Sequence, residues 1–141
     1  MRILFTGSNG LLGTPLVSLC IARGHEVFSG YAAGTPQPSG TPIPIDLTDH
    51  ASLQKAFEQS RPEAVFHLAA MTDVDRCEVE KKLASRVNEE GTRAVAVLAK
   101  KAGAKLVNVS TDYVFSGTAG LYKEDEATLP INHYGYTKLM A

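Results

Sequence analysis

The sequence has little excess charge of either sign and few cysteines. Its 14 lysines and arginines nearly balance 15 aspartates and glutamates, which leaves a formal net charge of -1. This balance argues against a protein that binds nucleic acid by neutralising many phosphates. The two cysteines, Cys20 and Cys77, show no metal-ligand spacing, so we expect reduced thiols in a reducing compartment. Small molecules are therefore the expected partners.

Long apolar runs are also absent. No stretch reaches the roughly 18 uninterrupted apolar residues that indicate a membrane span, and residues 1–7 lack the apolar segment and cleavage site of a signal peptide. We therefore expect a cytoplasmic protein without membrane contact. Hydrophobic residues make up 44% and charged residues 21% of the 141 residues, values that are typical of one folded globular domain.

Short apolar runs alternate with segments of helical periodicity. Strands are expected at residues 3–6, 26–29, 43–46, 64–68 and 105–110. Helices are expected at residues 11–23, at 48–60 or 49–60 after a Thr48 or Asp49 cap, at 74–102 with a break near Glu80, and from Tyr134 onward. Proline places 43–46 at a sheet edge, and the residues from Gly30 to Pro42 indicate a surface loop. The alternation predicts a three-layer α/β fold with a doubly wound parallel sheet.

Three glycines at a spacing of three lie between the first strand and the first helix. This is the context that a dinucleotide-binding loop requires. Gly7 permits the tight turn, Gly10 lets the backbone approach a pyrophosphate, and Gly13 lets the helix pack closely on the strand. A glycine-rich turn without a ligand is the alternative, but it requires fewer glycines. The residues expected at the cofactor are Gly7, Ser8, Asn9, Gly10, Leu11, Leu12 and Gly13.

The choice between NAD and NADP is usually settled at the end of the second strand. That region carries neither an acidic nor a basic residue, while Ser29 and Tyr31 offer hydroxyl groups to a 2′-phosphate. We therefore favour NADP slightly over NAD. Asp46 and Leu47 follow the third strand. Asp46 is equally suited to accepting from the adenine amino group and to a local turn or helix cap.

A tyrosine and a lysine four residues apart suggest acid–base chemistry. Tyr134 and Lys138 share one face of the last expected helix. An ammonium beside a phenol favours the phenolate and lowers a pKa that is ordinarily about 10. Alone, this spacing is common on helix surfaces. The hydroxyl groups of Ser110 and Thr111 follow the last expected strand, where either is able to donate to a substrate carbonyl.

Together, these motifs resemble the extended short-chain dehydrogenase/reductase family, and within it the dTDP-4-dehydrorhamnose reductases and their relatives. The string Ser-Thr-Asp-Tyr-Val-Phe at 110–115 is the most specific part of the resemblance. Further matching segments are residues 65–75, 87–92 and 130–134. The resemblance implies an NAD(P)-binding Rossmann fold over residues 1–141. It also implies reduction of the 4-keto group of a nucleotide-linked 6-deoxy sugar.

The resemblance also implies a role for each site residue. Tyr134 would protonate the sugar C4 oxygen, Lys138 would hold the nicotinamide ribose and lower the Tyr134 pKa, and Thr111 would polarise the carbonyl. The residues implied at the cofactor are Tyr134 and Lys138 themselves, together with Ala69, Ala70 and Ser110. On the same pattern His67 and Asn88 are mainly structural and Gly91 allows close packing.

Two departures from the family pattern bear on the activity. Family members continue into a smaller substrate domain that residues 1–141 do not contain, and Ser116 replaces a residue that is usually acidic or an amide. A chain that ended at Ala141 should bind nucleotide with little or no catalysis. Relatives often pair through helices of this region, which suggests a homodimer.

Two alternatives remain open. Relatives of the family serve as NADP-binding regulatory subunits of methionine adenosyltransferase, and others are nucleotide-sugar epimerases or dehydratases. Thr111 favours the reductase, because the regulatory relatives tend to carry serine at that position and the string around it is less typical of epimerases.

Overall fold

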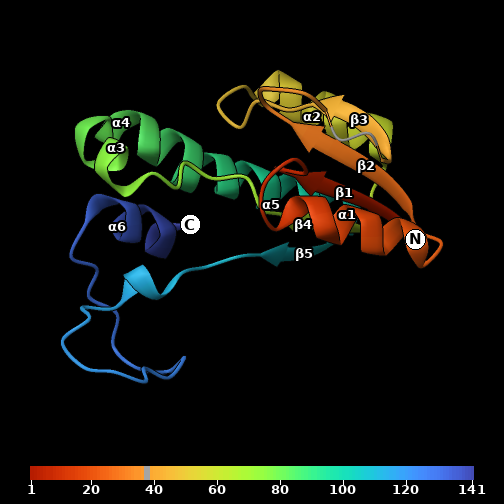
Figure 1. The fold of residues 1–141 in the computed structure, drawn as a ribbon. Coiled ribbons are helices and arrows are strands. Elements are labelled where there is room, and N and C mark those ends of the chain that lie inside the picture. Colours follow the sequence, from red (N-terminus) through yellow and green to blue (C-terminus); the bar gives the residue numbers. More distant parts are fainter. Residues whose placement is uncertain (37–38) are drawn as a thin grey trace.

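The computed structural model describes residues 1–36 and 39–141. Five strands form one sheet in the order β3-β2-β1-β4-β5, and every neighbouring pair is parallel (Figure 1). The strands are β1 (Arg2–Thr6), β2 (Glu26–Tyr31), β3 (Thr41–Pro44), β4 (Ala64–His67) and β5 (Lys105–Asn108). The expected doubly wound α/β fold is confirmed.

The helices follow the expected order with two additions. They are α1 (Gly13–Ala22), α2 (His50–Ser60), α3 (Val74–Val79), α4 (Lys81–Ala84), α5 (Gly91–Ala102) and α6 (His133–Met140). Asp49 caps α2 by accepting from the Ala51 amide, and Glu80 separates α3 from α4 as predicted. The additions are a π-helical segment, η1 (Ser85–Glu90), and a 3-10 turn, η2 (Asp112–Val114).

The central strand β1 is buried beneath helices on both faces of the sheet. Leu4 of β1 packs in a cluster with residues of α2 and α5, whereas Ile3 and Phe5 pack on the opposite face with Val17 and Cys20 of α1. Side chains that alternate between two buried faces give the near-continuous apolar run that the sequence shows. The result is a layer of α2 and α5, the sheet, and a layer of α1 (Figure 1).

All five strands differ from the expected bounds by one or two residues at one or both ends, and two of these differences have a clear physical reason. The strand expected at 43–46 spans Thr41–Pro44, and it lies at the sheet edge, where proline is tolerated. The strand expected to reach Ser110 ends at Asn108, because its partner β4 ends at the paired residue His67. The ends of the loop expected at 30–42 belong to β2 and β3, and its residues 37–38 lie outside the described residues.

Further expectations concern the cysteines and the membrane. Cys20 and Cys77 are both free, as expected of reduced thiols, and both are buried. Among the helices in residues 1–36 and 39–141, none has the length and apolar character needed to cross a bilayer.

The order of the strands reverses between β1 and β4, which predicts where a ligand would bind. From β1 the chain proceeds to β2 and β3 on one side and returns to β4 and β5 on the other. In such sheets, ligands bind beyond the carboxyl ends of the strands where the order reverses. The segments that follow β1 and β4 are therefore the place to look for a site.

Candidate functional site

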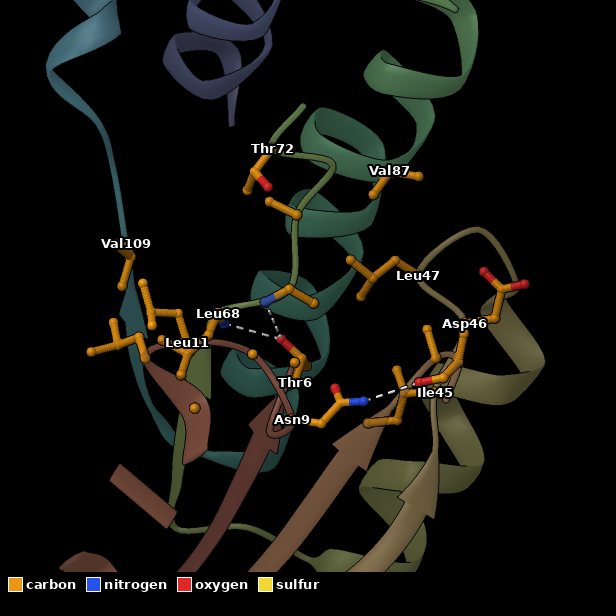
Figure 2. A pocket seen from close by; sticks show the side chains of 18 residues that line it. Thr6, Asn9, Leu11, Ile45, Asp46, Leu47, Leu68, Thr72, Val87 and Val109 are labelled. Atoms are coloured by element: carbon orange, nitrogen blue, oxygen red, sulfur yellow. Dashed lines mark hydrogen bonds between the residues drawn. The ribbon is translucent and has the colours of Figure 1, made fainter. Parts of the chain in front are cut away.

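A cavity of about 580 Å³ lies at this reversal of strand order (Figure 2). Its volume is in the range typical of small-molecule and cofactor sites. Ten residues that the sequence assigned to the cofactor line it: Gly7, Asn9, Gly10, Leu11, Leu12, Gly13, Asp46, Leu47, Ala69 and Ala70. The structure therefore brings together the glycine loop, the segment after β3 and the segment after β4.

The glycine loop has no room for side chains at its two ends. Gly7 has a φ of +68°, and a Cβ atom there would lie 2.8 Å from the Ala69 amide nitrogen. A Cβ atom on Gly13 would lie 2.3 Å from the Gly7 carbonyl oxygen and 2.7 Å from that of Ser8. These contacts involve backbone, which cannot move aside as a flexible side chain can. Gly7 and Gly13 thus permit the turn and the close helix packing that the spacing predicted.

The loop also presents hydrogen-bond donors to the cavity. Helix α1 begins without a side-chain cap and has no acidic residue in its first turn. Within the described part of the chain, the amides of Leu11 and Leu12 have no hydrogen-bond partner. Free amides at a helix N-terminus attract an anion such as a pyrophosphate. A side chain at Gly10, which also lines the cavity, would narrow the approach to these donors.

Ser8 takes a different position from its neighbours in the loop. Its side chain is fully buried and does not line the cavity. Its Oγ is the buried side-chain polar atom that lacks a partner among the described residues. The fit of a dinucleotide therefore rests on the loop backbone rather than on the Ser8 hydroxyl.

The region expected near the adenosine ribose is arranged differently from the prediction. Ser29 is fully buried, and its hydroxyl donates to the Ser39 carbonyl at 2.8 Å, so the structure does not bring it to the cavity. Tyr31 does not line the cavity either, whereas Ala32 and Ala33 do. The side-chain amide of Asn9 donates to the Ala33 carbonyl at 3.0 Å and so joins the glycine loop to this segment.

Asp46 lines the cavity but is engaged in a local turn. Its Oδ1 accepts from the Thr48 amide and from the Thr48 hydroxyl, both at 2.8 Å. These hydrogen bonds, the amide first, hold the Asp46 pKa below its ordinary value. The sequence allowed Asp46 either to bind the adenine amino group or to form a local turn, and in the structure it forms the turn.

His67 lies in a buried hydrogen-bond network beneath the cavity. Thr92 donates its hydroxyl to the Asn88 carbonyl at 2.6 Å, so the 2.9 Å contact between Thr92 and His67 requires a proton on the His67 Nε2. Its Nδ1 then accepts from the Thr6 hydroxyl at 2.7 Å. The Thr6 oxygen in turn accepts from the Leu68 and Ala69 amides (Figure 2). His67 is structural, as the resemblance implied, and it is neutral.

The stability of the fold should fall in mild acid because of His67. Burial, with a smaller contribution from the charge of Lys138, lowers the His67 pKa from 6.5 to about 4. The unfolded chain takes up a proton near pH 6.5, but the folded chain resists it until about pH 4. Stability is therefore complete above pH 6.5 and falls by about 3 kcal/mol as the pH approaches 4.

Chemical denaturation at several pH values between 7 and 4 measures this dependence. The variant His67→Asn should lose the part of the slope that the imidazole contributes. His25→Asn is the matched control, since it removes an imidazole outside the Thr6–His67–Thr92 network. An equal pH dependence in wild type and His67→Asn would refute the assignment.

The expected catalytic residues lie beside the cavity rather than in its lining. The Lys138 ammonium donates to the Val109 carbonyl at 2.7 Å, and Val109 lines the cavity. The Tyr134 ring makes an edge contact with Tyr113, with centroids 5.7 Å apart, and the Thr111 hydroxyl is within hydrogen-bonding reach of the Tyr134 phenol. The structure thus groups Thr111, Tyr134 and Lys138 near one end of the cavity. Ser110 is exposed and does not line it.

The pKa of Tyr134 departs from the expectation. Burial raises it, and the hydrogen bond with Thr111 only partly offsets this effect. Lys138 is not among the groups that shift it, and the ammonium is instead engaged with the Val109 carbonyl. Burial also lowers the Lys138 pKa. The expected lowering of the Tyr134 pKa by Lys138 is therefore not what this structure shows.

Several lining residues were not assigned to the site from the sequence. They are Thr6, Ala32, Ala33, Ile45, Leu68, Thr72, Val87 and Val109. Val87 belongs to η1, and the helical periodicity gave no sign of this π-helical segment. Gly91, which follows it, packs so closely on Leu47 that a Cβ atom there would lie 2.9 Å from the Leu47 Cβ. The close packing expected of Gly91 is confirmed, and it places Leu47 in the cavity wall.

Curated proteins with different functions resemble the chain. It is 42% identical to a dTDP-4-dehydrorhamnose reductase of Streptomyces griseus over 138 residues, which cover 97% of the chain and 42% of the reductase. It is 34% identical to methionine adenosyltransferase 2 subunit beta of Xenopus laevis over 139 residues, which cover 98% of the chain and 40% of that protein. The chain thus spans less than half the length of each relative.

Solved structures share the fold over nearly the whole chain. A dTDP-4-dehydrorhamnose reductase of Bacillus anthracis in complex with NADP matches with a TM-score of 0.84 and 35% identity, covering 99% of this chain and 47% of that one. A UDP-glucose 4-epimerase of Thermus thermophilus in complex with NAD matches with a TM-score of 0.88 and 28% identity, covering 98% and 47%.

The family comparison covers the chain completely. The family described as RmlD substrate binding domain matches residues 1–141, a range that includes the glycine loop and the Tyr134–Lys138 helix. The chain therefore belongs to the RmlD substrate binding domain family, and the resemblance to dTDP-4-dehydrorhamnose reductases that its motifs indicated is confirmed.

Proposed function

We propose that this chain is the dinucleotide-binding domain of a reductase. The enzyme reduces the 4-keto group of a nucleotide-linked 6-deoxy sugar with NADPH or NADH. One observation carries the proposal: Lys138 of the Tyr-x-x-x-Lys helix donates to the carbonyl of Val109, a residue of the glycine-loop cavity wall. The acid–base pair and the cofactor cavity are thereby held at the same place. The 42% identity to a dTDP-4-dehydrorhamnose reductase supports the substrate class.

The residues of the cavity suit a nicotinamide dinucleotide. The free amides of Leu11 and Leu12 would hold the pyrophosphate, and the absence of side chains at Gly7, Gly10 and Gly13 admits it. Ala69 and Ala70 would line the path toward the nicotinamide. The bound cofactor would supply the hydride.

A preference for NADP over NAD forms part of the proposal. The end of β2, from Gly30 to Ala33, carries no carboxylate that would repel a 2′-phosphate. Of the two hydroxyl groups predicted to donate to the 2′-phosphate, that of Ser29 already donates to the Ser39 carbonyl. The Tyr31 hydroxyl is therefore the proposed donor. The similar Bacillus anthracis reductase binds NADP, which supports this choice.

Tyr134 is the proposed proton donor. Burial raises its pKa, so the phenol keeps its proton at neutral pH until a developing oxyanion accepts it. Thr111, which reaches the same phenol, would donate to the carbonyl oxygen as that oxygen gains charge. Lys138, held by the Val109 carbonyl, would contact the nicotinamide ribose.

Other features of the whole protein belong to the proposal as well. A substrate domain outside residues 1–141 would complete the sugar site, since the relatives are about twice as long as the matched region. The partner is a nucleotide sugar rather than nucleic acid or membrane, and the protein would act in the cytoplasm. Pairing through the helices of this region would give a homodimer.

A second candidate function is a regulatory subunit that binds the dinucleotide without reducing a sugar. The 34% identity to methionine adenosyltransferase 2 subunit beta supports it. Thr111 supports the first candidate, because the regulatory relatives tend to carry serine at that position. A nucleotide-sugar epimerase is the remaining alternative, supported by the structural match to the Thermus thermophilus enzyme.

Sugar-dependent oxidation of NADPH distinguishes these candidates. The complete protein is mixed with NADPH and a dTDP-4-keto-6-deoxy sugar, and the loss of nicotinamide absorbance is followed. A reductase consumes NADPH in proportion to the added sugar. NADPH that binds but is never consumed would favour the regulatory subunit. Inversion at C4 of a nucleotide sugar that is supplied with its C4 hydroxyl group and with NAD, without net release of NADH, would favour the epimerase.

A further inference from the structure

A fully hydrogen-bonded side chain connects the helix of Tyr134 to the cavity wall. Asn88, in the π-helical segment η1, is buried and accepts from the Met71 amide through Oδ1 at 2.7 Å. Its amide group donates to the Met71 carbonyl and to the Thr137 hydroxyl, both at 3.0 Å. Both N–H groups and the carbonyl oxygen of Asn88 are thus used, and a flipped amide would place like groups against each other.

Thr137 completes this connection on α6. It is fully buried, and its hydroxyl donates to the Tyr134 carbonyl at 2.8 Å while it accepts from Asn88. A threonine in a helix often returns its hydroxyl to a preceding carbonyl without any further partner. Here the oxygen of the same hydroxyl also accepts a hydrogen bond from the side-chain amide of Asn88, which lies 49 residues away in the sequence. The orientation of both groups is therefore fixed.

The two residues beside Met71 belong to the cavity. Ala70 and Thr72 both line it, and Figure 2 shows the position of Thr72. Asn88 forms hydrogen bonds with both the N–H and the C=O of Met71, which lies between them. A shift of α6 along this wall would have to break the contact between Asn88 and Thr137.

Helix α6 depends on such contacts, because much of its surface is not buried. It has eight residues, and the side chains of Tyr136, Leu139 and Met140 are exposed. The Thr137 contact connects it to the segment after β4, and the Lys138 contact with Val109 connects it to the segment after β5. The remaining polar contacts of α6 lie at its N-terminal end.

We propose that Thr137 is a positioning residue, which acts through Asn88 to hold the Tyr134 phenol at a fixed place relative to the cofactor cavity. The proposal rests on the proposed function for its catalytic consequence. The positioning itself is a property of this chain. A misplacement of about 1 Å is enough to lower a catalytic rate by about 10²-fold.

Nuclear magnetic resonance on the 141-residue chain tests the positioning without any activity. The edge contact between the Tyr113 and Tyr134 rings gives a cross-relaxation signal between their ring protons. Thr137→Val removes the hydroxyl and should weaken or abolish this signal while the amide spectrum of the sheet is preserved. Thr137→Ser keeps the hydroxyl and should keep the signal. If Thr137→Val does not fold, the smaller Thr137→Ala replaces it.

Two outcomes would overturn the proposal. An unchanged ring signal in Thr137→Val or Thr137→Ala would show that the hydroxyl does not place Tyr134. Loss of the signal in Thr137→Ser as well would assign the effect to the methyl group.

Kinetics on the complete protein add a second readout. Thr137→Val should lower kcat by about 10²-fold and leave the KM for NADPH within about twofold, while Thr137→Ser restores kcat. Equal losses in kcat in both variants, or a change confined to KM, would contradict the positioning role. If the wild-type protein reduces no sugar, the proposed function fails, and the ring signal still decides the position of Tyr134.

Discussion

Replacing Tyr134 with phenylalanine should lower kcat for sugar reduction by about 10²–10⁴-fold, the usual contribution of a general acid. The variant removes only the phenolic O–H. The ring and its edge contact with Tyr113 stay in place. The raised pKa of Tyr134 keeps the phenol protonated at neutral pH, and a phenylalanine ring has no such proton to give. Because Tyr134 does not line the cavity, the affinity for NADPH should stay nearly unchanged.

The measurement compares turnover and NADPH affinity in the complete protein. Tyr136→Phe is the matched control, since Tyr136 lies on the same helix with its side chain exposed and is expected to retain full turnover. Undiminished turnover in Tyr134→Phe would exclude this phenol as the proton donor. An equal loss in the Tyr136→Phe variant would point to disturbance of the helix instead.

Replacing Gly13 with alanine should abolish dinucleotide binding and destabilise the fold. The added Cβ atom would lie 2.3 Å from the Gly7 carbonyl oxygen and 2.8 Å from the Ser8 carbonyl carbon, so helix α1 and the loop must move apart. Such overpacking costs about 3 kcal/mol, which corresponds to a decrease in Tm of roughly 6–12 °C for a chain of this length. The same movement displaces the amides of Leu11 and Leu12 from their common orientation.

Thermal unfolding and NADPH titration measure the two effects separately. Gly120→Ala is the control, because no atom lies within 4 Å of the position that its Cβ would take, and both Tm and affinity should remain as in wild type. Wild-type affinity in folded Gly13→Ala would contradict the assignment of the glycine loop as the binding element.

The sequence was most informative where the requirement is local. The backbone itself requires glycine at both ends of the glycine loop. Gly7 has a positive φ, and at Gly13 the Gly7 carbonyl oxygen lies too close to leave room for any Cβ atom. The β1 strand was equally evident, since its side chains are buried on both faces of the sheet. In such cases the local backbone geometry or burial restricts the residue type, so the residue type predicts the geometry.

Features that depend on distant residues were not accessible from the sequence. The spacing of Tyr134 and Lys138 suggested that the ammonium lowers the phenol pKa, but a carbonyl 29 residues before Lys138 accepts from that ammonium. Ser29 was a reasonable partner for a phosphate until the fold buried it against Ser39. The π-helical turn that places Val87 at the cavity has no periodicity of its own.

Titration of the 141-residue chain with NADPH and with NADH, followed by nicotinamide fluorescence, tests most directly whether the glycine-loop cavity binds a dinucleotide. We predict saturable binding, tighter for NADPH than for NADH, that is lost in Gly13→Ala. A folded sample that binds neither nucleotide would contradict both the reductase and the regulatory subunit.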